Sequence, residues 1–188
     1  MLPFRVYLLS GLVAHKLVWE VWKRHRRVEP KPVPSLTTRL VKIVKLGILA
    51  GVVVQTALPW DVASITNEPF MIRAIGVVLY TIGLGTAIVG RIQLGDSWSD
   101  IETPRAERDT VVVSRGLYRF IRHPIYSGDL MLLLGLELAV NSWLVLVVLA
   151  MIPAVFYRAI REEQMLAQRV AGYDTYLRGT KRFIPFVV

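Results

Sequence analysis

Cysteine is absent from the 188-residue sequence, which excludes disulfide bonds, thiolate metal ligands and cysteine nucleophiles. Histidine is scarce: His15, His25 and His123 lie in three separate segments, without the spacing of a metal site. No serine sits in the GxSxG turn of a serine hydrolase. We therefore expect neither a metal centre nor a covalent nucleophile.

Acidic residues are few, 14 against 23 lysines and arginines, and the formal net charge is +9. The basic residues lie in blocks between apolar segments instead of along one continuous surface. That distribution is typical of a chain that borders an anionic membrane face. We expect membrane lipids, and not nucleic acid, to be its charged partners.

Apolar residues make up 54% of the chain and the mean hydropathy is +0.47. A soluble domain is less apolar, so the composition predicts one membrane-embedded domain over residues 1–188. The first apolar run ends in VWEVWKRHRR, an aromatic and basic border. Such a border favours a retained span over a cleaved signal peptide.

Five apolar segments predict an all-α integral membrane protein with five transmembrane helices, since a span needs about 20 mostly apolar residues. The last two are shorter and are separated by Asn141 and Ser142 alone, which predicts an antiparallel helical hairpin. The predicted spans are Leu2–Trp22, Leu40–Trp60, Phe70–Leu94, Ile125–Val140 and Trp143–Tyr157.

The distribution of basic residues predicts the orientation of these spans. Residues 23–39 between the first two spans are rich in lysine and arginine, whereas residues 61–69 have none. The positive-inside rule then places the N-terminus outside, and the segment 95–124 and the C-terminal tail in the cytoplasm.

Polar chemistry is concentrated in RGLYRFIRHPIYSGD, residues 115–129, at the predicted start of the fourth span. Pro124 suits the first turn of a helix, whose free N–H groups favour an anion. His123 adds a switchable donor or acceptor, and Tyr118 and Tyr126 add flat apolar faces with polar tips. These groups suit a small zwitterionic aromatic ligand, and the alternative is an ordinary basic membrane border with tyrosines at the interface. The three arginines of this segment are expected to face lipid headgroups: Arg115, Arg119 and Arg122.

A second polar cluster follows the fifth span, where Arg158 and Glu162 are one helical turn apart and Glu163 adjoins them. Because the last two spans form a hairpin, His123 and Glu162 should lie at the same depth. Ionisable groups at a membrane boundary that face a cavity are candidates for function. A carboxylate there could hold ribose hydroxyls or an amino group, and the arginine could hold a substrate carboxylate.

The motifs LGDSW, TVVVSRGLYRFIRHPIYSGD, REEQML and GYDTYLRGTKRFIPF, taken together, resemble the isoprenylcysteine carboxyl methyltransferase family and its relatives among the phospholipid N-methyltransferases. The resemblance covers about residues 90–186. It implies an S-adenosylmethionine-dependent methyltransferase embedded in the membrane, with three N-terminal spans in residues 1–94 and a cofactor-binding catalytic half in residues 95–188.

The resemblance also implies roles for individual residues. Arg158 handles the substrate, and Arg158 and Glu162 are the catalytic residues. Glu163 is an alternative to Glu162 as the cofactor contact. The cofactor-binding residues that it implies are Val111, Val112, Val113, Tyr118, His123, Pro124, Ile125, Tyr126 and Glu162.

The expected reaction is methyl transfer to a lipophilic acceptor, first of all the carboxylate of a prenylcysteine-like substrate. A phospholipid amine or another small lipophilic acceptor, methylated on nitrogen, oxygen or sulfur, is the alternative within the same class. A non-enzymatic membrane protein that binds anionic lipid or a protein partner is the alternative from another class.

Overall fold

Five long helices and two short ones form the part of the chain that the computed structural model describes, residues 2–24, 36–58, 60–95 and 112–185. The all-α prediction is confirmed for these residues. In chain order the elements are α1 (Leu2–Arg24), α2 (Leu36–Ala57), α3 (Phe70–Leu94), the 3₁₀-helix η2 (Gly116–Arg119), α4 (Pro124–Ala139), α5 (Val145–Arg169) and α6 (Tyr173–Gly179).

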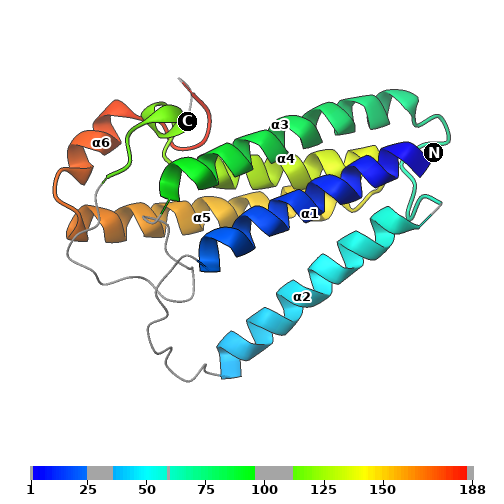
Figure 1. Ribbon diagram of the computed structural model, residues 1–188, viewed down its shortest axis with the longest axis horizontal. Helices are drawn as coiled ribbons and strands as arrows, with labels where there is room; N and C mark the ends of the chain where they lie inside the picture. Colours follow the sequence, from blue (N-terminus) through cyan, green and yellow to red (C-terminus); the bar gives the residue numbers. More distant parts are fainter. Residues whose placement is uncertain (1, 25–35, 59, 96–111, 186–188) are drawn as a thin grey trace.

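The five long helices alternate in direction along one bundle axis (Figure 1). One end of the bundle, which we call the N-terminal end, carries the start of α1 and the turn between α4 and α5. The opposite end, called the site end, carries η2, α6 and the start of α4. Helix α2 lies apart from the other four at its Leu36 end and approaches them at its Ala57 end.

The third span was predicted with the bounds that the structure has, while other bounds differ. Helix α2 ends at Ala57, so Trp60 lies outside it, and α5 continues to Arg169, twelve residues beyond the predicted end at Tyr157. By length and composition, α3 is the helix among the described residues that is long and apolar enough to cross a membrane. Helix α4 has 16 residues, fewer than the roughly 20 of a full span. The five-span count therefore stays a prediction.

Helices α3 and α4 make the closest contact in the bundle, because glycines on both helices let the backbones meet. A Cβ on Gly83 would clash with the backbone of Leu132, and one on Gly135 would clash with the backbone of Tyr80. Small residues at such crossings are typical of helices packed within a membrane.

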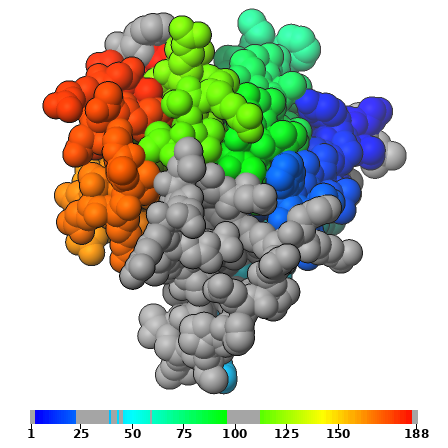
Figure 2. All heavy atoms as spheres, turned by 60° about the vertical axis from the view of Figure 1, so that its left-hand side comes forward, coloured from blue at the N-terminus to red at the C-terminus, as the bar shows by residue number. Residues whose placement is uncertain are grey.

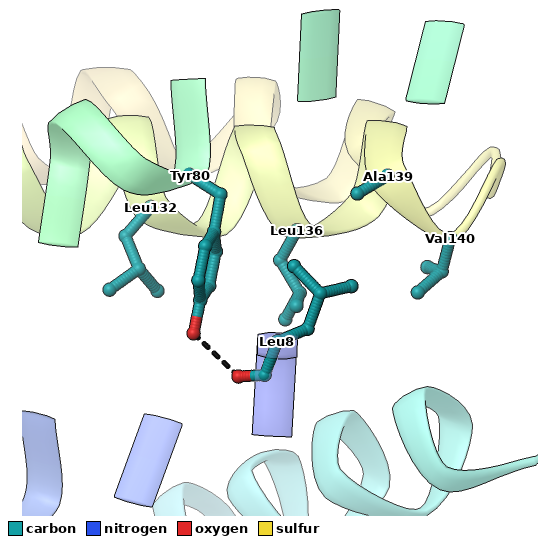
Figure 3. Packing of buried hydrophobic residues seen from close by; sticks show 6 residues of the cluster. All are labelled: Leu8, Tyr80, Leu132, Leu136, Ala139 and Val140. Carbon is teal, nitrogen blue, oxygen red and sulfur yellow. Dashed lines mark hydrogen bonds between the residues drawn. The ribbon is translucent and has the colours of Figure 1, made fainter. Parts of the chain in front are cut away.

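The buried core lies beside this contact, where α1 packs against α3 and α4 (Figure 3). The Tyr80 hydroxyl donates a hydrogen bond of 2.6 Å to the carbonyl oxygen of Leu8, so the buried tyrosine is satisfied by the α1 backbone. The cluster consists of Leu8, Tyr80, Leu132, Leu136, Ala139 and Val140. It fixes the distance between α1 and α4 below the site end.

Large apolar side chains cover the outer faces of the long helices. Leu17 on α1, Leu46 on α2, Ile75 on α3 and Val147 on α5 are each more than half exposed. A surface of this kind would be unfavourable in water and is typical of helices that face lipid.

Polar contacts at the N-terminal end hold the loops and the helical hairpin in place. The Asp61 carboxylate accepts hydrogen bonds from Arg5 at 2.9 Å, from Arg73 at 2.6 Å and from the Asn141 amide at 3.1 Å. Asn141 has a φ of +57°, a left-handed conformation that asparagine tolerates better than most residues. The connection between α4 and α5 runs over residues 140–144, longer than the two residues predicted, and it still joins the two helices as an antiparallel hairpin.

Candidate active site

The site end is assembled from the end of α3, the segment 112–123, the start of α4, the end of α5 and the C-terminal tail. Figure 2 looks toward this end, where the atoms of α5 and α6, of residues 112–123, of α3 and of α1 follow one another across the face. Gly116 has a φ of +60° and lies against the Gln93 side chain, which accepts a hydrogen bond of 2.8 Å from the Leu117 N–H. The RGLY segment is thereby fixed to the end of α3.

Helix α4 begins at Pro124, as the motif predicts, with His123 as its preceding residue. The His123 N–H donates to the carbonyl oxygen of Arg182 at 3.0 Å, so the C-terminal tail holds the start of this helix. Pro124 and Ile125 are both buried. The Ile125 side chain packs against Gly90 of α3. A Cβ added at Gly90 would lie 3.2 Å from the isoleucine side chain.

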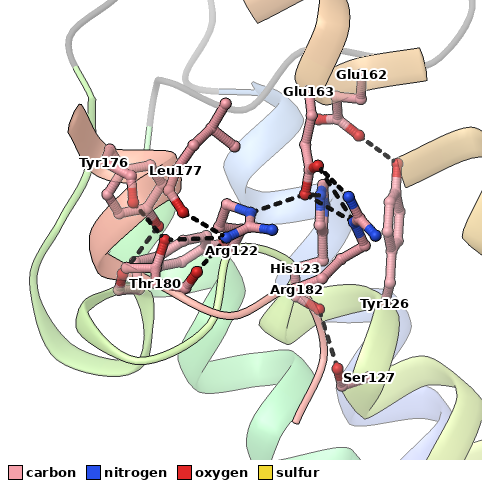
Figure 4. A network of polar contacts seen from close by, with 11 residues as sticks. Arg122, His123, Tyr126, Ser127, Glu162, Glu163, Tyr176, Leu177, Thr180 and Arg182 are labelled. Atoms are coloured by element: carbon pink, nitrogen blue, oxygen red, sulfur yellow. Dashed lines mark hydrogen bonds and ion pairs between the residues drawn. The ribbon is translucent and has the colours of Figure 1, made fainter. Parts of the chain in front are cut away.

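Glu163 is the centre of a buried charge network (Figure 4). Its carboxylate accepts hydrogen bonds from Arg122 Nε at 2.8 Å and from Arg182 Nη2 at 2.8 Å, and lies 3.1 Å from His123 Nε2. Burial alone would raise the pKa of this carboxyl, but the hydrogen bonds from His123, Arg182 and Arg122 hold it well below its ordinary value. Glu163 is therefore ionised and fully engaged by its neighbours.

The prediction that Arg122 faces headgroups is wrong. Its side chain is 9% exposed and also donates hydrogen bonds to the carbonyl oxygens of Leu177 and Thr180. The tail returns here, because the Arg122 N–H donates to the Lys181 carbonyl at 2.8 Å. Arg115 and Arg119 are exposed, consistent with the prediction for those two residues.

Arg182 is the residue that the sequence reasoning missed altogether. It sits in the RFIP segment, stacks over the Phe156 ring at 5.1 Å and donates to both oxygens of Glu163. The pattern RFIP was available as a signal, but nothing in its spacing indicated that the tail turns back onto α4.

Glu162 has a different environment from Glu163. It accepts a hydrogen bond of 2.7 Å from the Tyr126 hydroxyl, whose oxygen in turn accepts one of 3.1 Å from Arg158 Nε. The Tyr126 ring is stacked on the His123 ring, with 5.2 Å between centroids and 6° between planes. Glu162, Tyr126, Arg158 and His123 therefore lie together. The predicted hairpin placed His123 and Glu162 at the same depth, as found here.

Several polar atoms of this cluster have no protein partner among the described residues. They are the second carboxylate oxygen of Glu162, the two terminal nitrogens of Arg158, and Nδ1 of His123. All three residues are at least partly buried. None of these atoms is among the fully buried unpartnered side-chain atoms of the described residues, so they are accessible and can bind a polar ligand.

Tyr118 closes the cluster on the side of the 112–123 segment. Its ring is 5% exposed and its carbonyl oxygen accepts a hydrogen bond of 2.8 Å from the Tyr176 hydroxyl. Burial, with smaller contributions from Tyr176 and Glu162, raises the pKa of Tyr118 far above its ordinary value; burial also raises the pKa of Tyr176 to about 12. Both phenols are therefore neutral donors at physiological pH.

The remaining predicted residues are Val111, Val112 and Val113. Val112 and Val113 are half-buried just before η2, and Val111 lies outside the described residues. In the described part of the chain, no three His, Cys, Asp or Glu residues are grouped so that they could hold a metal ion.

A family model described as phospholipid methyltransferase matches residues 71–171, which is more than half of the chain. The chain belongs to the phospholipid methyltransferase family. The match runs from the start of α3 to the end of α5 and so includes η2, His123 and the Glu162–Glu163 pair. The family resemblance drawn from the motifs is confirmed.

Two relatives of this phospholipid methyltransferase family member are similar over parts of their length. The protein-S-isoprenylcysteine O-methyltransferase of Schizosaccharomyces pombe is 26% identical over 128 residues, 63% of this chain and 54% of the relative. The cobalt-zinc-cadmium resistance protein CzcN of Cupriavidus metallidurans is 32% identical over 111 residues, 58% of this chain and 49% of the relative. The chain thus spans about half the length of these two relatives.

One solved structure is similar in fold, that of a eukaryotic intramembrane Ras methyltransferase, an isoprenylcysteine carboxyl methyltransferase. The TM-score is 0.54 at 18% sequence identity, over 82% of this chain and 55% of the other. The family member therefore shares its helical architecture with an intramembrane protein.

Proposed function

We propose that this protein is an S-adenosylmethionine-dependent methyltransferase that acts on a lipophilic acceptor at a membrane surface. The observation that carries the proposal is the chain of contacts from Glu162 through Tyr126 to Arg158. Among the residues that the structure describes, no side chain or backbone group pairs with the second carboxylate oxygen of Glu162 or with the two terminal nitrogens of Arg158, and both residues are partly buried. Membership of the phospholipid methyltransferase family supports the same reaction class.

The residues present fit the cofactor, because their free atoms match its polar groups. The free oxygen of Glu162 suits an amino group or ribose hydroxyls, and the neutral Tyr118 hydroxyl and the free nitrogen of His123 suit hydrogen bonds to other polar atoms. The stacked His123 and Tyr126 rings give a flat face beside them. The proposed cofactor-binding set is Val111, Val112, Val113, Tyr118, His123, Pro124, Ile125, Tyr126 and Glu162.

Glu163 has another role in this proposal. Its carboxylate forms ion pairs with the guanidinium groups of Arg122 and Arg182, and it also contacts Nε2 of the His123 ring. With Nε2 donating to the carboxylate, Nδ1 is left as the acceptor that faces away from the network. We propose that Glu162 contacts the cofactor and that Glu163 positions His123.

Arg158 is the proposed substrate contact. Its Nε is held by the Tyr126 hydroxyl, so its two terminal nitrogens are fixed in direction and can bind a carboxylate oxygen of the acceptor. When bound, the cofactor would supply a methyl group activated by its positively charged sulfur. A carboxylate oxygen of the acceptor would bond to the methyl carbon while the carbon–sulfur bond breaks and leaves a neutral thioether, so no proton has to be removed. The protein must then mainly hold the acceptor in line and exclude water. The carboxylate of a prenylcysteine-like molecule is the first acceptor to test, since a relative is named for that activity.

A phospholipid amine is the second candidate acceptor, favoured by the description of the matching family model. An ammonium group must lose a proton before it attacks, and Glu163 is a poor proton acceptor because its pKa is depressed. The free oxygen of Glu162 would have to take this proton.

The proposed setting is a multi-pass arrangement of five spans with the N-terminus outside and the active site facing the cytoplasm. The apolar outer faces of α1, α2, α3 and α5 support the placement in lipid. A lipophilic acceptor would then enter from the bilayer while the cofactor arrives from water.

Transfer of a labelled methyl group in detergent tests this function. The acceptors are prenylcysteines, phosphatidylethanolamine and quinol-like molecules. We expect transfer to a carboxylate acceptor, and a loss of about 10- to 100-fold in kcat/KM for Arg158→Ala, as for a charged hydrogen bond. Arg161→Ala, which removes an exposed arginine from the same helix, is the matched control and should leave the rate unchanged. Absence of transfer to every acceptor would favour a non-enzymatic lipid-binding or partner-binding protein and would overturn the proposal.

A further inference from the structure

The C-terminal tail after α6 is fixed beside the His123 ring. The His123 N–H donates to the carbonyl oxygen of Arg182 at 3.0 Å, and the Ser127 hydroxyl donates to that of Phe183 at 2.9 Å. The Phe183 ring also contacts the His123 ring, with 5.7 Å between centroids. These contacts hold the tail where the Arg182 side chain reaches Glu163 (Figure 4).

The Glu163 carboxylate faces three groups that can carry a positive charge. Arg182 donates to both of its oxygens, at 3.1 Å to Oε1 and at 2.8 Å to Oε2. Arg122 Nε donates to Oε1 at 2.8 Å, and His123 Nε2 lies 3.1 Å from the same oxygen. A guanidinium group stays protonated, so two positive charges already face one negative charge. A protonated His123 would add a third.

The other ionisable groups around this network leave the positive surplus in place. The Tyr126 ring is stacked on His123, and its hydroxyl keeps its proton because it donates to Glu162. Tyr173 of α6 is neutral too, since burial raises its pKa far above the ordinary value. Among the described residues, three guanidinium groups therefore face two carboxyl groups, those of Arg122, Arg158, Arg182, Glu162 and Glu163.

The charge of the His123 ring decides what its second nitrogen can do. An ionised carboxylate only accepts hydrogen bonds, so Nε2 carries the proton that faces Glu163. In a neutral ring Nδ1 is then an acceptor. A second proton would bind to Nδ1 and turn this acceptor into a donor, which would change the hydrogen bonds that the ring can offer a ligand.

We propose that Arg182 is a positioning residue that keeps the His123 ring neutral, with Nδ1 as a free acceptor, by engaging both oxygens of Glu163. The use of Nδ1 by the cofactor rests on the proposed function. The charge of the ring is a property of the protein without ligand and can be measured separately. The RFIP segment then acts on the site through this charge as well as through its backbone contacts.

Heteronuclear NMR of isotope-labelled histidine rings in the full chain, without ligand, tests the proposal between about pH 5 and 8. His15→Gln and His25→Gln assign the His123 signals. We expect a protonated Nε2 and a bare Nδ1 in the native protein. Arg182→Gln should raise the pH at which Nδ1 takes up a proton by about one unit, because a nearby positive charge is removed. Glu163→Gln should lower that pH, because both guanidinium groups then lack their counter-ion.

Two variants are the controls. Lys181→Gln removes the same charge from the preceding residue, whose side chain is exposed, and should leave the titration of His123 unchanged. Arg182→Lys keeps the charge and should titrate close to the native protein. In a parallel calorimetric titration at the acid end of the range, Arg182→Gln should bind S-adenosylhomocysteine about 10-fold more weakly than the native protein, and equally well at the alkaline end.

Two results would overturn the role of Arg182: a native His123 that is doubly protonated near neutral pH, or a titration of Arg182→Gln that matches the native one. In either case the methyltransferase function stands if S-adenosylhomocysteine binds. If Arg182→Gln does not fold, the shift in Glu163→Gln decides, since a rise or no change contradicts the proposal. If the ring titrates as expected but the native protein does not bind S-adenosylhomocysteine, the role of Arg182 stands and the proposed function falls.

Discussion

Replacing Glu163 by glutamine removes one negative charge and leaves the shape of the side chain nearly unchanged. In the native protein this carboxylate neutralises two guanidinium groups whose side chains are 9% and 24% exposed, those of Arg122 and Arg182. In the variant the two positive charges face each other without a counter-ion, and His123 loses its charged partner.

The magnitude follows from the burial of these groups. Removal of one partner from a buried ion pair costs about 3–5 kcal/mol, because the remaining charge is left uncompensated. For a domain of this size, 1 kcal/mol corresponds to roughly 2–4 °C in melting temperature, which gives a decrease of roughly 6–20 °C. Differential scanning fluorimetry in detergent, with and without S-adenosylhomocysteine, measures this decrease.

Glu162→Gln is the matched comparison, since it removes the same charge from the preceding residue. Glu162 accepts one hydrogen bond, from Tyr126, and no guanidinium contacts it among the described residues. We expect Glu162→Gln to melt close to the native temperature while it loses the stabilisation that S-adenosylhomocysteine adds. Equal melting temperatures for Glu163→Gln and the native protein would refute the argument, and so would a larger decrease for Glu162→Gln.

Two further predictions concern helix packing and acid stability. Gly83→Ala should lower the melting temperature, because its Cβ would clash with the Leu132 backbone, and should reduce the free energy of unfolding by about 1–3 kcal/mol. The control is Gly85→Ala on the same helix. Its Cβ meets no atom within 4 Å, so it should be neutral or slightly stabilising in the same scan. The ionised Glu163 carboxylate stabilises the folded protein, because its pKa is lower there than in the unfolded chain. This stabilisation is complete above the pKa of the unfolded chain, about 4.3, and is lost as the pH falls through the lower pKa of the folded protein. The difference in melting temperature between the native protein and Glu163→Gln should therefore be constant from pH 7 to about 5 and shrink below about 4; a constant difference at low pH would contradict this assignment.

Much of the framework could be predicted from local patterns in the sequence. The bounds of Phe70–Leu94 were predictable because the apolar run and the helix end together. Only Asn141 and Ser142 separate the last two apolar segments, so the sequence predicted a helical hairpin. The hairpin in turn predicted that His123 lies near the glutamate pair.

Other features depend on how helices end and rotate, which composition does not determine. Helix α5 continues past the apolar run because REEQMLAQR is rich in good helix formers, and the chain turns only near Gly172 with its φ of +78°. Adjacent glutamates point about 100° apart on a helix, so only the observed rotation shows that Glu163 faces the arginines and Glu162 faces Tyr126.

The burial of Arg122 could not be predicted, because it requires a contact between residues almost sixty positions apart. A run of arginines beside an apolar segment is typical of a headgroup border, and this border is what the sequence indicated. Of the three arginines in this run, Arg122 is the one that the returning tail buries, by placing Thr180 and Lys181 against it.

We propose that the polar atoms around His123 and Glu162 bind S-adenosylmethionine. Isothermal titration of the full chain in detergent with S-adenosylhomocysteine measures this binding. We expect saturable binding to the native protein that is lost in His123→Ala and in Glu162→Ala, and retained in Arg161→Ala. Absence of binding to the native protein, or equal affinity in all of these variants, would contradict it.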